Sequence, residues 1–201
     1  MNEKCISDIM EMEWSMFSNV QNRGGTAPCQ QDQKTFLVMR LSQMMNWTEP
    51  MLESYREDLK DALKQGRNLM TEKYGHMMRH TVPMEYEQIR AGLPVVSAEA
   101  LALADRITIL MVRWAEESTK RYPKLLKAGR PIESKEDTAH VTSLETYTRG
   151  ELLTYSFRTL QLVWAFVSEE AKAGRNHYEA VLTNTARFYG YADMTEMESA
   201  L

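Results

Sequence analysis

The stretch EKYGHMMRHTVPMEYE, residues 72–87, contains two of the four histidines of this 201-residue chain. In an α-helix, residues spaced four apart drift around the axis by only about 40° per step, so Glu72, His76 and His80 would share one ridge. Two histidines at this spacing can bind one zinc ion, as they do in proteins with an HExxH helix. Here Met-Met-Arg separates the histidines, so the glutamate that serves as general base in such enzymes is missing.

Three interpretations of this ridge are open. The side chains can be solvent-exposed at a helix end, can transfer protons to a substrate, or can bind a divalent metal ion. For proton transfer, His76 and His80 are the catalytic candidates, with Tyr74 and Arg79 as substrate contacts beside them. For metal binding, the predicted ligands are Glu72, His76 and His80.

A second candidate is Glu13, which interrupts an apolar stripe. Apolar residues recur at helical spacing over residues 6–20, and position 13 falls on their side of the helix. A buried carboxylate is costly unless it is paired, protonated or bound to metal. Arg40 shares a helical stripe with Gln43 and is the natural partner. The pattern predicts either a buried structural pair or a catalytic Glu13 with Arg40 and Gln43 as substrate contacts.

A third candidate is a polar stripe in the segment 144–172. Five polar residues recur there at steps of four and three: Tyr147, Glu151, Thr154, Arg158 and Gln161. Such a stripe normally faces solvent, but on a central helix it would line an internal pocket. In that case Glu151 and Arg158 would contact a substrate, because a guanidinium group suits a carboxylate or phosphate.

The elements that must position these residues are helical. Apolar residues recur at spacings of three and four along most of the chain, and no segment alternates as a strand does. We predict one all-α domain over residues 1–201, a bundle of about five to seven helices with a largely buried helix near 144–172. The third helix, which Thr48 caps, either continues through Gly66 and Gly75 or breaks at one of them.

Composition is typical of a soluble globular domain. The formal net charge of −4 does not favour nucleic acid, and no apolar run approaches the ~20 residues of a membrane span. Two cysteines without CxxC spacing are expected to be reduced thiols. The N-terminal segment lacks the features of a signal peptide, so we expect a cytoplasmic protein. Residues 120–135, with six Lys or Arg and one acid, form either a solvated surface or a docking patch.

The order of short motifs resembles a known family. EWSMF is followed by GGTAPCQ, TFLVMRLSQ and Trp47, and the likeness extends through YGHMMRHT to FYGYADMTE. Over most of the chain this series resembles the bacterial domain-of-unknown-function family 4125. The resemblance implies a bacterial cytosolic protein and supplies no activity and no catalytic residue.

Two function classes stay open. The first is an enzyme that acts on a small polar or anionic molecule between helices by acid–base or metal-assisted chemistry. Its cofactor is unknown, with a divalent metal as one candidate, and it requires the polar residues to converge. The second is a non-catalytic helical protein that binds a protein partner through a methionine-rich groove or the basic residues 120–135. Both classes are compatible with a homo-oligomer.

Overall fold

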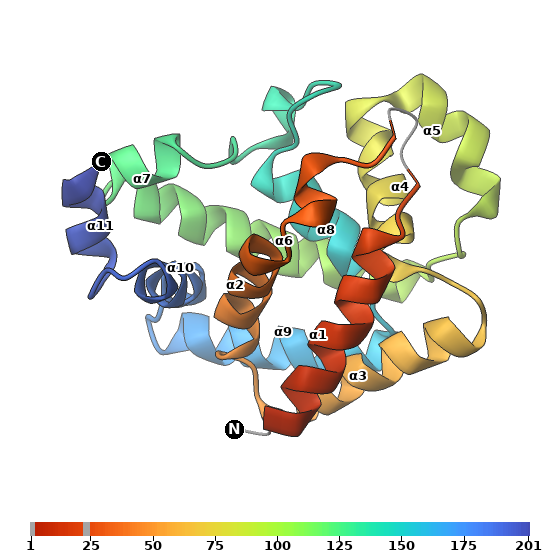
Figure 1. Ribbon diagram of the computed structural model, residues 1–201, viewed down its shortest axis with the longest axis horizontal. Coiled ribbons are helices and arrows are strands. Elements are labelled where there is room, and N and C mark those ends of the chain that lie inside the picture. Colours follow the sequence, from red (N-terminus) through yellow and green to blue (C-terminus); the bar gives the residue numbers. More distant parts are fainter. Residues whose placement is uncertain (1–2, 22–24) are drawn as a thin grey trace.

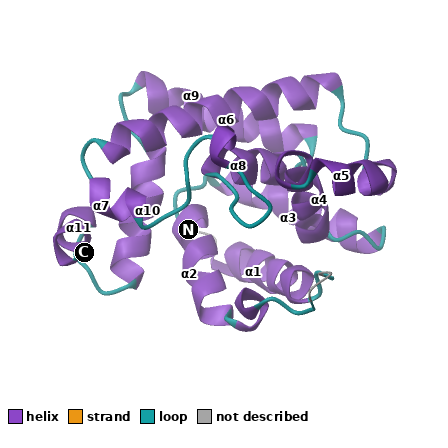
Figure 2. Cartoon of the chain, turned by 90° about the horizontal axis from the view of Figure 1, so that it is seen from above, coloured by secondary structure: helices purple, strands orange, loops and turns teal. Residues whose placement is uncertain are grey.

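The computed structural model describes residues 3–21 and 25–201, and every regular element in these ranges is a helix (Figure 1). Figure 2 shows these helices joined by loops, without strands among the described residues. The all-α prediction is confirmed, but the predicted five to seven helices are too few, since this part of the chain forms eleven α-helices. None of these helices is both long and apolar enough to cross a lipid bilayer.

The helices follow one another in this order. The α-helices are α1 (Glu3–Ser18), α2 (Gln33–Met44), α3 (Glu49–Lys64), α4 (Leu69–Thr81), α5 (Pro83–Ile89), α6 (Ala98–Thr119), α7 (Pro123–Lys127), α8 (Leu144–Leu152), α9 (Phe157–Lys172), α10 (His177–Phe188) and α11 (Met194–Ala200). Three short 3-10 helices are η1 (Pro28–Gln31), η2 (Arg90–Gly92) and η3 (Ser134–Glu136).

Polar residues mark where most of the longer helices begin. In each case the side chain accepts a hydrogen bond from the backbone N–H three residues later, which satisfies a donor that the helix itself leaves unpaired. The capping residues are Asp32, Asn68, Ser97, Ser143, Ser156, Asn176 and Asp193. Thr48 occupies the N-cap position of α3 as predicted, but its side chain makes no capping bond.

The chain leaves α3 at Gly66, whose φ of +67° lies in the left-handed region that favours glycine. The Arg67 N–H then donates to the Ala62 carbonyl at 2.8 Å, which closes the helix end. Gly75, in contrast, lies inside α4, where an added Cβ would be 2.8 Å from the Leu93 side chain. The predicted third helix therefore breaks at Gly66 and resumes as α4, which continues through Gly75.

The segment 144–172 forms two helices rather than one. Ser156 interrupts it by capping α9, since its hydroxyl oxygen accepts a hydrogen bond from the Thr159 N–H at 3.2 Å. Because the chain turns at this point, Glu151 of α8 is buried whereas Arg158 of α9 is exposed. The prediction of one continuous buried helix near 144–172, with a single polar stripe, is wrong.

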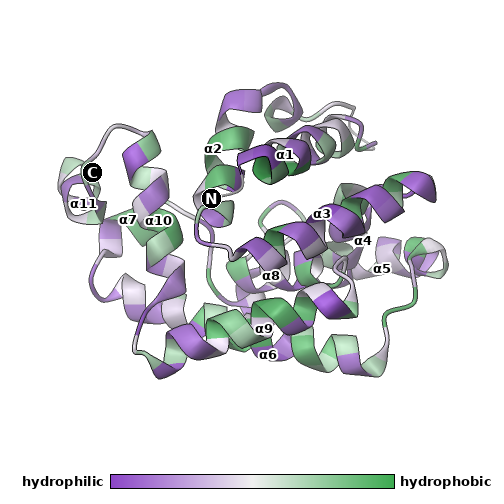
Figure 3. Ribbon diagram, turned by 90° about the horizontal axis from the view of Figure 1, so that it is seen from below, coloured by the Kyte–Doolittle hydropathy of each residue, from purple (hydrophilic) through white to green (hydrophobic). Residues whose placement is uncertain are grey.

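The core lies where the long helices pack in pairs. α4 packs against α8, α6 against α9, α1 against α3 and α2 against α10. In Figure 3, hydrophobic and hydrophilic residues alternate along α3 and α9, as expected of amphipathic helices with one buried side. Tyr55, Ile9, Leu59 and Leu160 are among the largest side chains without solvent contact. Burial of a side chain of this size contributes about 1.5–3 kcal/mol.

Helices α4 and α8 approach closely at Gly150. An added Cβ at this position would lie 2.7 Å from Cγ of Met77 and 3.1 Å from the carbonyl oxygen of Lys73. Glycine therefore allows the two backbones to come this near. The approach brings Lys73 of α4 beside Glu151, the residue that follows Gly150 in α8.

Candidate functional site

Four charged side chains meet in the interior, where α1, α2, α4 and α8 come together. The Arg40 guanidinium donates to both carboxylate oxygens of Glu13, from Nε at 2.8 Å and from Nη2. Arg40 Nη1 also donates to Oε1 of Glu151 at 2.8 Å. Lys73 Nζ donates to the other oxygen of Glu151 at 2.5 Å. Two carboxylates thus face two cations, and the set is electrically neutral.

Three uncharged side chains complete this set. The Tyr55 hydroxyl donates to Oε1 of Glu13 at 2.6 Å, and the Tyr155 hydroxyl donates to Oε1 of Glu151 at 2.8 Å. Gln43 accepts a hydrogen bond of 2.6 Å from Arg40 Nη1. We call these seven residues the ion cluster: Glu13, Arg40, Gln43, Tyr55, Lys73, Glu151 and Tyr155.

The charged side chains of the ion cluster are buried, with Glu13 at 0% and Lys73 at 2% exposure, whereas Gln43 is half-buried. Burial opposes ionisation of Glu151, but the Arg40 and Lys73 cations outweigh it and hold the pKa of this carboxyl well below its usual range. Burial and the neighbouring Glu13 charge raise the pKa of the Tyr55 hydroxyl well above its ordinary value. Each carboxylate therefore has its hydrogen-bond donors inside the protein. Because the four charged residues belong to α1, α2, α4 and α8, their ion pairs connect these helices.

The structure places four predicted site residues in this cluster, namely Glu13, Arg40, Gln43 and Glu151. It contains the Glu13–Arg40 pair that was one of the two interpretations of these residues. None of the four lines either of the two hollows described next. A catalytic role for Glu13 has no support in this geometry, because the carboxylate has no solvent contact.

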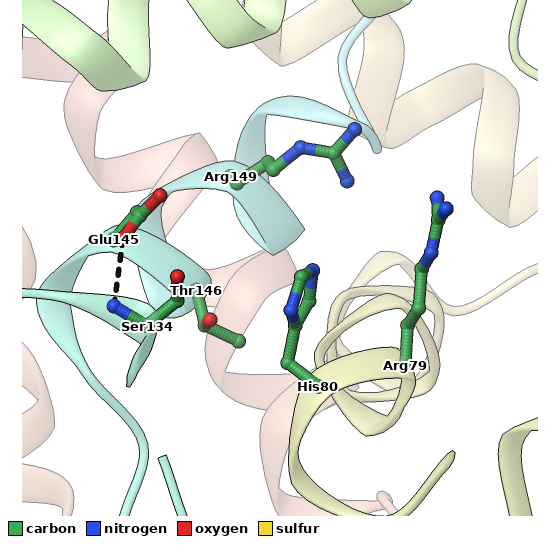
Figure 4. A pocket seen from close by; sticks show the side chains of 6 residues that line it. All are labelled: Arg79, His80, Ser134, Glu145, Thr146 and Arg149. Carbon is green, nitrogen blue, oxygen red and sulfur yellow. Dashed lines mark hydrogen bonds between the residues drawn. The ribbon is translucent and has the colours of Figure 1, made fainter. Parts of the chain in front are cut away.

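Two neighbouring hollows lie on the surface above α4 and α8, and Arg79 and Arg149 line both. The first has a volume of about 190 Å³, and its lining residues are shown in Figure 4: Arg79, His80, Ser134, Glu145, Thr146 and Arg149. The second has a volume of about 220 Å³ and is lined by His76, Arg79, Tyr86, Arg90, Leu93, Pro94, Val95, Val96, Leu101, Arg149 and Leu153. We call the two together the α4–α8 cleft.

The two residues that line both hollows are arginines, Arg79 and Arg149. In Figure 4 the side chains of Arg79, Arg149 and His80 point toward the same space. Arg79 makes no hydrogen bond or ion pair with any residue that the structure describes. Arg149 donates from Nε to Asp105 Oδ1 at 2.7 Å, and its two Nη groups have no partner in the described part of the chain. Two guanidinium groups with unused N–H donors are suited to a carboxylate or a phosphate.

The two histidines of α4 lie one turn apart and in different hollows, His76 in the second and His80 in the first. Burial lowers the pKa of His76 below its ordinary value; the Glu72 charge acts against this shift and Arg149 reinforces it. The imidazole is therefore neutral near pH 7. A neutral imidazole in a hollow can accept a proton from a bound molecule.

The predicted metal ligands do not gather around a common point. The Arg67 guanidinium donates to both oxygens of Glu72, from Nε at 2.8 Å and from Nη2 at 2.7 Å. Within residues 3–21 and 25–201, no three His, Cys, Asp or Glu side chains lie close enough to hold a metal ion. The prediction that Glu72, His76 and His80 bind a metal has no support here, because the ion pair with Arg67 occupies the carboxylate.

The other predicted contacts lie outside the cleft. Tyr74 packs against the core, and burial raises the pKa of its hydroxyl. Arg158 is exposed on α9 and lines neither hollow. In the basic segment 120–135, Arg121 pairs with Glu179 at 2.5 Å, so part of that charge is used within the protein. Neither hollow is lined by methionine, so the predicted methionine-rich groove has no counterpart in the cleft.

Sequence reasoning missed Lys73 and Arg149. Lys73 did carry a signal, because it lies three residues after Met70 and four before Met77, both of which are buried. It thus interrupts an apolar stripe as Glu13 does. No local pattern marks Arg149, whose place in the cleft follows from the packing of α8 against α4.

Comparison with known proteins identifies a family. The model of the family described as "Protein of unknown function (DUF4125)" matches residues 3–199, so the chain belongs to this family. The family resemblance inferred from the motifs is confirmed over nearly the whole chain. Searches of curated proteins and of solved structures give no match.

Proposed function

We propose that this member of the DUF4125 family binds a small anionic molecule in the α4–α8 cleft beside His76, whose imidazole takes up a proton when the anion binds. The observation that carries the proposal is the pair Arg79 and Arg149, which come from different helices and line both hollows. Arg79 has no described partner, and Arg149 uses only its Nε on Asp105. An anion between them would receive charge-assisted hydrogen bonds from both guanidinium groups.

The charge of the cleft favours an anion although the protein as a whole carries −4. Three arginines line it, and Arg90 is engaged by Glu87 at 2.8 Å. Glu145 is the one acid among the described lining residues, and its Oε2 accepts a hydrogen bond from the Ser134 N–H at 2.7 Å. Arg79 is then the arginine of the cleft without an ion pair among the described residues, and Arg149, although paired with Asp105 through Nε, keeps its two Nη groups available to orient an anion.

His76 is a better candidate for proton uptake than His80, because His76 is half-buried beside both arginines in the second hollow, whereas His80 in the first hollow is exposed. Its lowered pKa leaves the imidazole free to accept a proton at neutral pH. An anion bound nearby stabilises the protonated imidazole and raises its pKa. Binding near pH 7 would therefore be accompanied by uptake of a proton at His76.

Titration calorimetry with inorganic phosphate and with acetate at low ionic strength tests anion binding. We expect saturable binding to the wild-type protein and an affinity at least about tenfold lower in Arg79→Ala, equivalent to the ~1.4 kcal/mol of one charge-assisted hydrogen bond. Arg113→Ala is the matched control, since Arg113 is exposed on α6 and pairs only with Glu117 among the described residues. Equal weakening in the control would show non-specific attraction, and absence of saturable binding would refute the proposal.

Calorimetry in two buffers of different ionisation enthalpy tests the role of His76. The wild-type protein should take up a fraction of a proton on binding an anion at pH 7. His76→Gln should bind the anion without this uptake, because glutamine cannot be protonated. Unchanged proton uptake in His76→Gln would assign the proton to another group and would remove His76 from the proposal.

A further inference from the structure

We infer that the ligand of the α4–α8 cleft is an organic anion with a short apolar group attached to its charged head. This rests on the proposed function and deepens it by naming the ligand class. The head lies between Arg79 and Arg149, and the apolar group lies in the second hollow.

The two hollows differ in chemistry. Besides the two shared arginines, the first is lined only by polar side chains: His80, Ser134, Glu145 and Thr146. The second has six aliphatic lining residues: Leu93, Pro94, Val95, Val96, Leu101 and Leu153. Inorganic phosphate or acetate would use the arginines and leave this aliphatic wall uncovered. An apolar substituent would cover the wall, and burial of apolar area stabilises the complex.

The aliphatic wall is positioned by the close packing of Leu93 on α4. Gly75 has no side chain, and an added Cβ there would lie 2.8 Å from Cδ2 of Leu93 and 3.5 Å from Cδ1 of Ile89. Leu93 therefore rests against the α4 backbone one residue before His76. The wall thus stands next to the imidazole and the arginines.

Val95 marks the open edge of this wall. Its side chain is 99% exposed, although it lines the second hollow. One exposed valine is ordinary on a protein surface. Here it lines the same hollow as five other aliphatic residues, so a ligand in that hollow can cover it.

The size of the second hollow limits the apolar group. Its volume of about 220 Å³ is below the ~300–1,000 Å³ of pockets that hold drug-sized ligands. We therefore expect a short alkyl group, rather than a drug-sized apolar group, to occupy this hollow.

A homologous ligand series tests this inference. Dissociation constants are measured by calorimetry for inorganic, methyl, ethyl, propyl and butyl phosphate, with carboxylates from acetate to pentanoate as a parallel series. Each buried methylene should tighten binding by about fourfold, the equivalent of ~0.8 kcal/mol. At equal chain length, the series with the lower dissociation constants identifies the head group.

Variants of the wall locate the apolar group. Val96→Ser should flatten the dependence of the affinity on chain length. Val95→Ser gives the same test without risk to folding, because this side chain is almost fully exposed. Ile109→Ser is the control, since Ile109 is 69% exposed on α6 and lines neither hollow.

The outcomes separate the inference from the proposed function. Phosphate binding that depends on Arg79 but not on chain length would overturn the inference and leave the proposed function standing. A chain-length dependence that survives in both valine variants would place the apolar group elsewhere and would also overturn the inference. Failure of every ligand to bind would overturn both.

Discussion

Replacement of Glu13 by glutamine removes one charge from the ion cluster and keeps the size of the side chain. In the wild-type protein two carboxylates face two cations. In Glu13→Gln, Arg40 and Lys73 face Glu151 alone, which leaves one unbalanced positive charge in the interior. Removal of one partner from a buried ion pair costs about 3–5 kcal/mol. This is a large fraction of the ~5–15 kcal/mol by which a domain is stable.

A second substitution should partly cancel the first. Arg40→Met alone leaves Glu13 and Glu151 facing Lys73, so it also unbalances the cluster. The double variant Glu13→Gln/Arg40→Met leaves Lys73 beside Glu151, which is a neutral pair. The double variant should therefore be no less stable than the worse single variant, with an interaction free energy of about 0.5–3 kcal/mol.

The free energies of unfolding are measured by urea titration followed by far-ultraviolet circular dichroism at pH 7. Glu117→Gln is the control, because Glu117 is 43% exposed in its pair with Arg113 and should change stability by less than about 0.5 kcal/mol. A loss below about 1 kcal/mol in Glu13→Gln, or strict additivity in the double variant, would refute the description of the charged residues of the cluster as buried and electrically neutral as a set.

Two further predictions concern stability. Burial lowers the pKa of His177, whose ring packs 5.1 Å from that of Phe166, from 6.5 to about 4. The unfolded chain binds the proton more readily in this window, so stability should fall by about 3 kcal/mol as the pH drops from above 6.5 to 4. Urea titrations across this range should show a smaller loss in His177→Phe; an equal loss would assign it to other groups. Gly150→Ala should destabilise by about 1–3 kcal/mol, because its Cβ would overlap Met77. Thermal unfolding should show little change in the control Gly92→Ala, where nothing lies within 4 Å, and an equally small change in Gly150→Ala would contradict the close approach of α4 and α8.

Local chemistry made much of the fold predictable. Helical periodicity and capping side chains placed Ser97 and Asn176 at helix starts, and both accept the expected backbone hydrogen bond. The fate of Gly66 and Gly75 could not be predicted locally. Gly75 fits inside α4 because Leu93, eighteen residues later, packs against it.

The interior charges were partly predictable, because Glu13 interrupts an apolar stripe and Arg40 is its natural partner. The spacing of residues along the sequence could not show that Glu151 pairs with Lys73 and with Arg40, because these contacts require α2, α4 and α8 to come together. The cleft was predictable only for its α4 residues. Arg149 belongs to it through tertiary packing. Of the three interpretations left open for the ridge of Glu72, the sequence could not favour one, because it did not show that Arg67, just before the helix, pairs with Glu72.

The ion cluster also bears on which compact states the chain can reach while it folds. A collapsed species built from residues 1–81 would bury Glu13, Arg40 and Lys73 without Glu151, and would therefore carry one unbalanced positive charge. This charge would keep water in the interior until α8 packs against α4. A shift of α1 by one residue would rotate Glu13 by about 100° away from Arg40. Apolar side chains alone tolerate such slips, but paired charges do not. The buried charges would thus favour the one alignment of these helices in which every charge is paired, over packings that bury similar apolar surface.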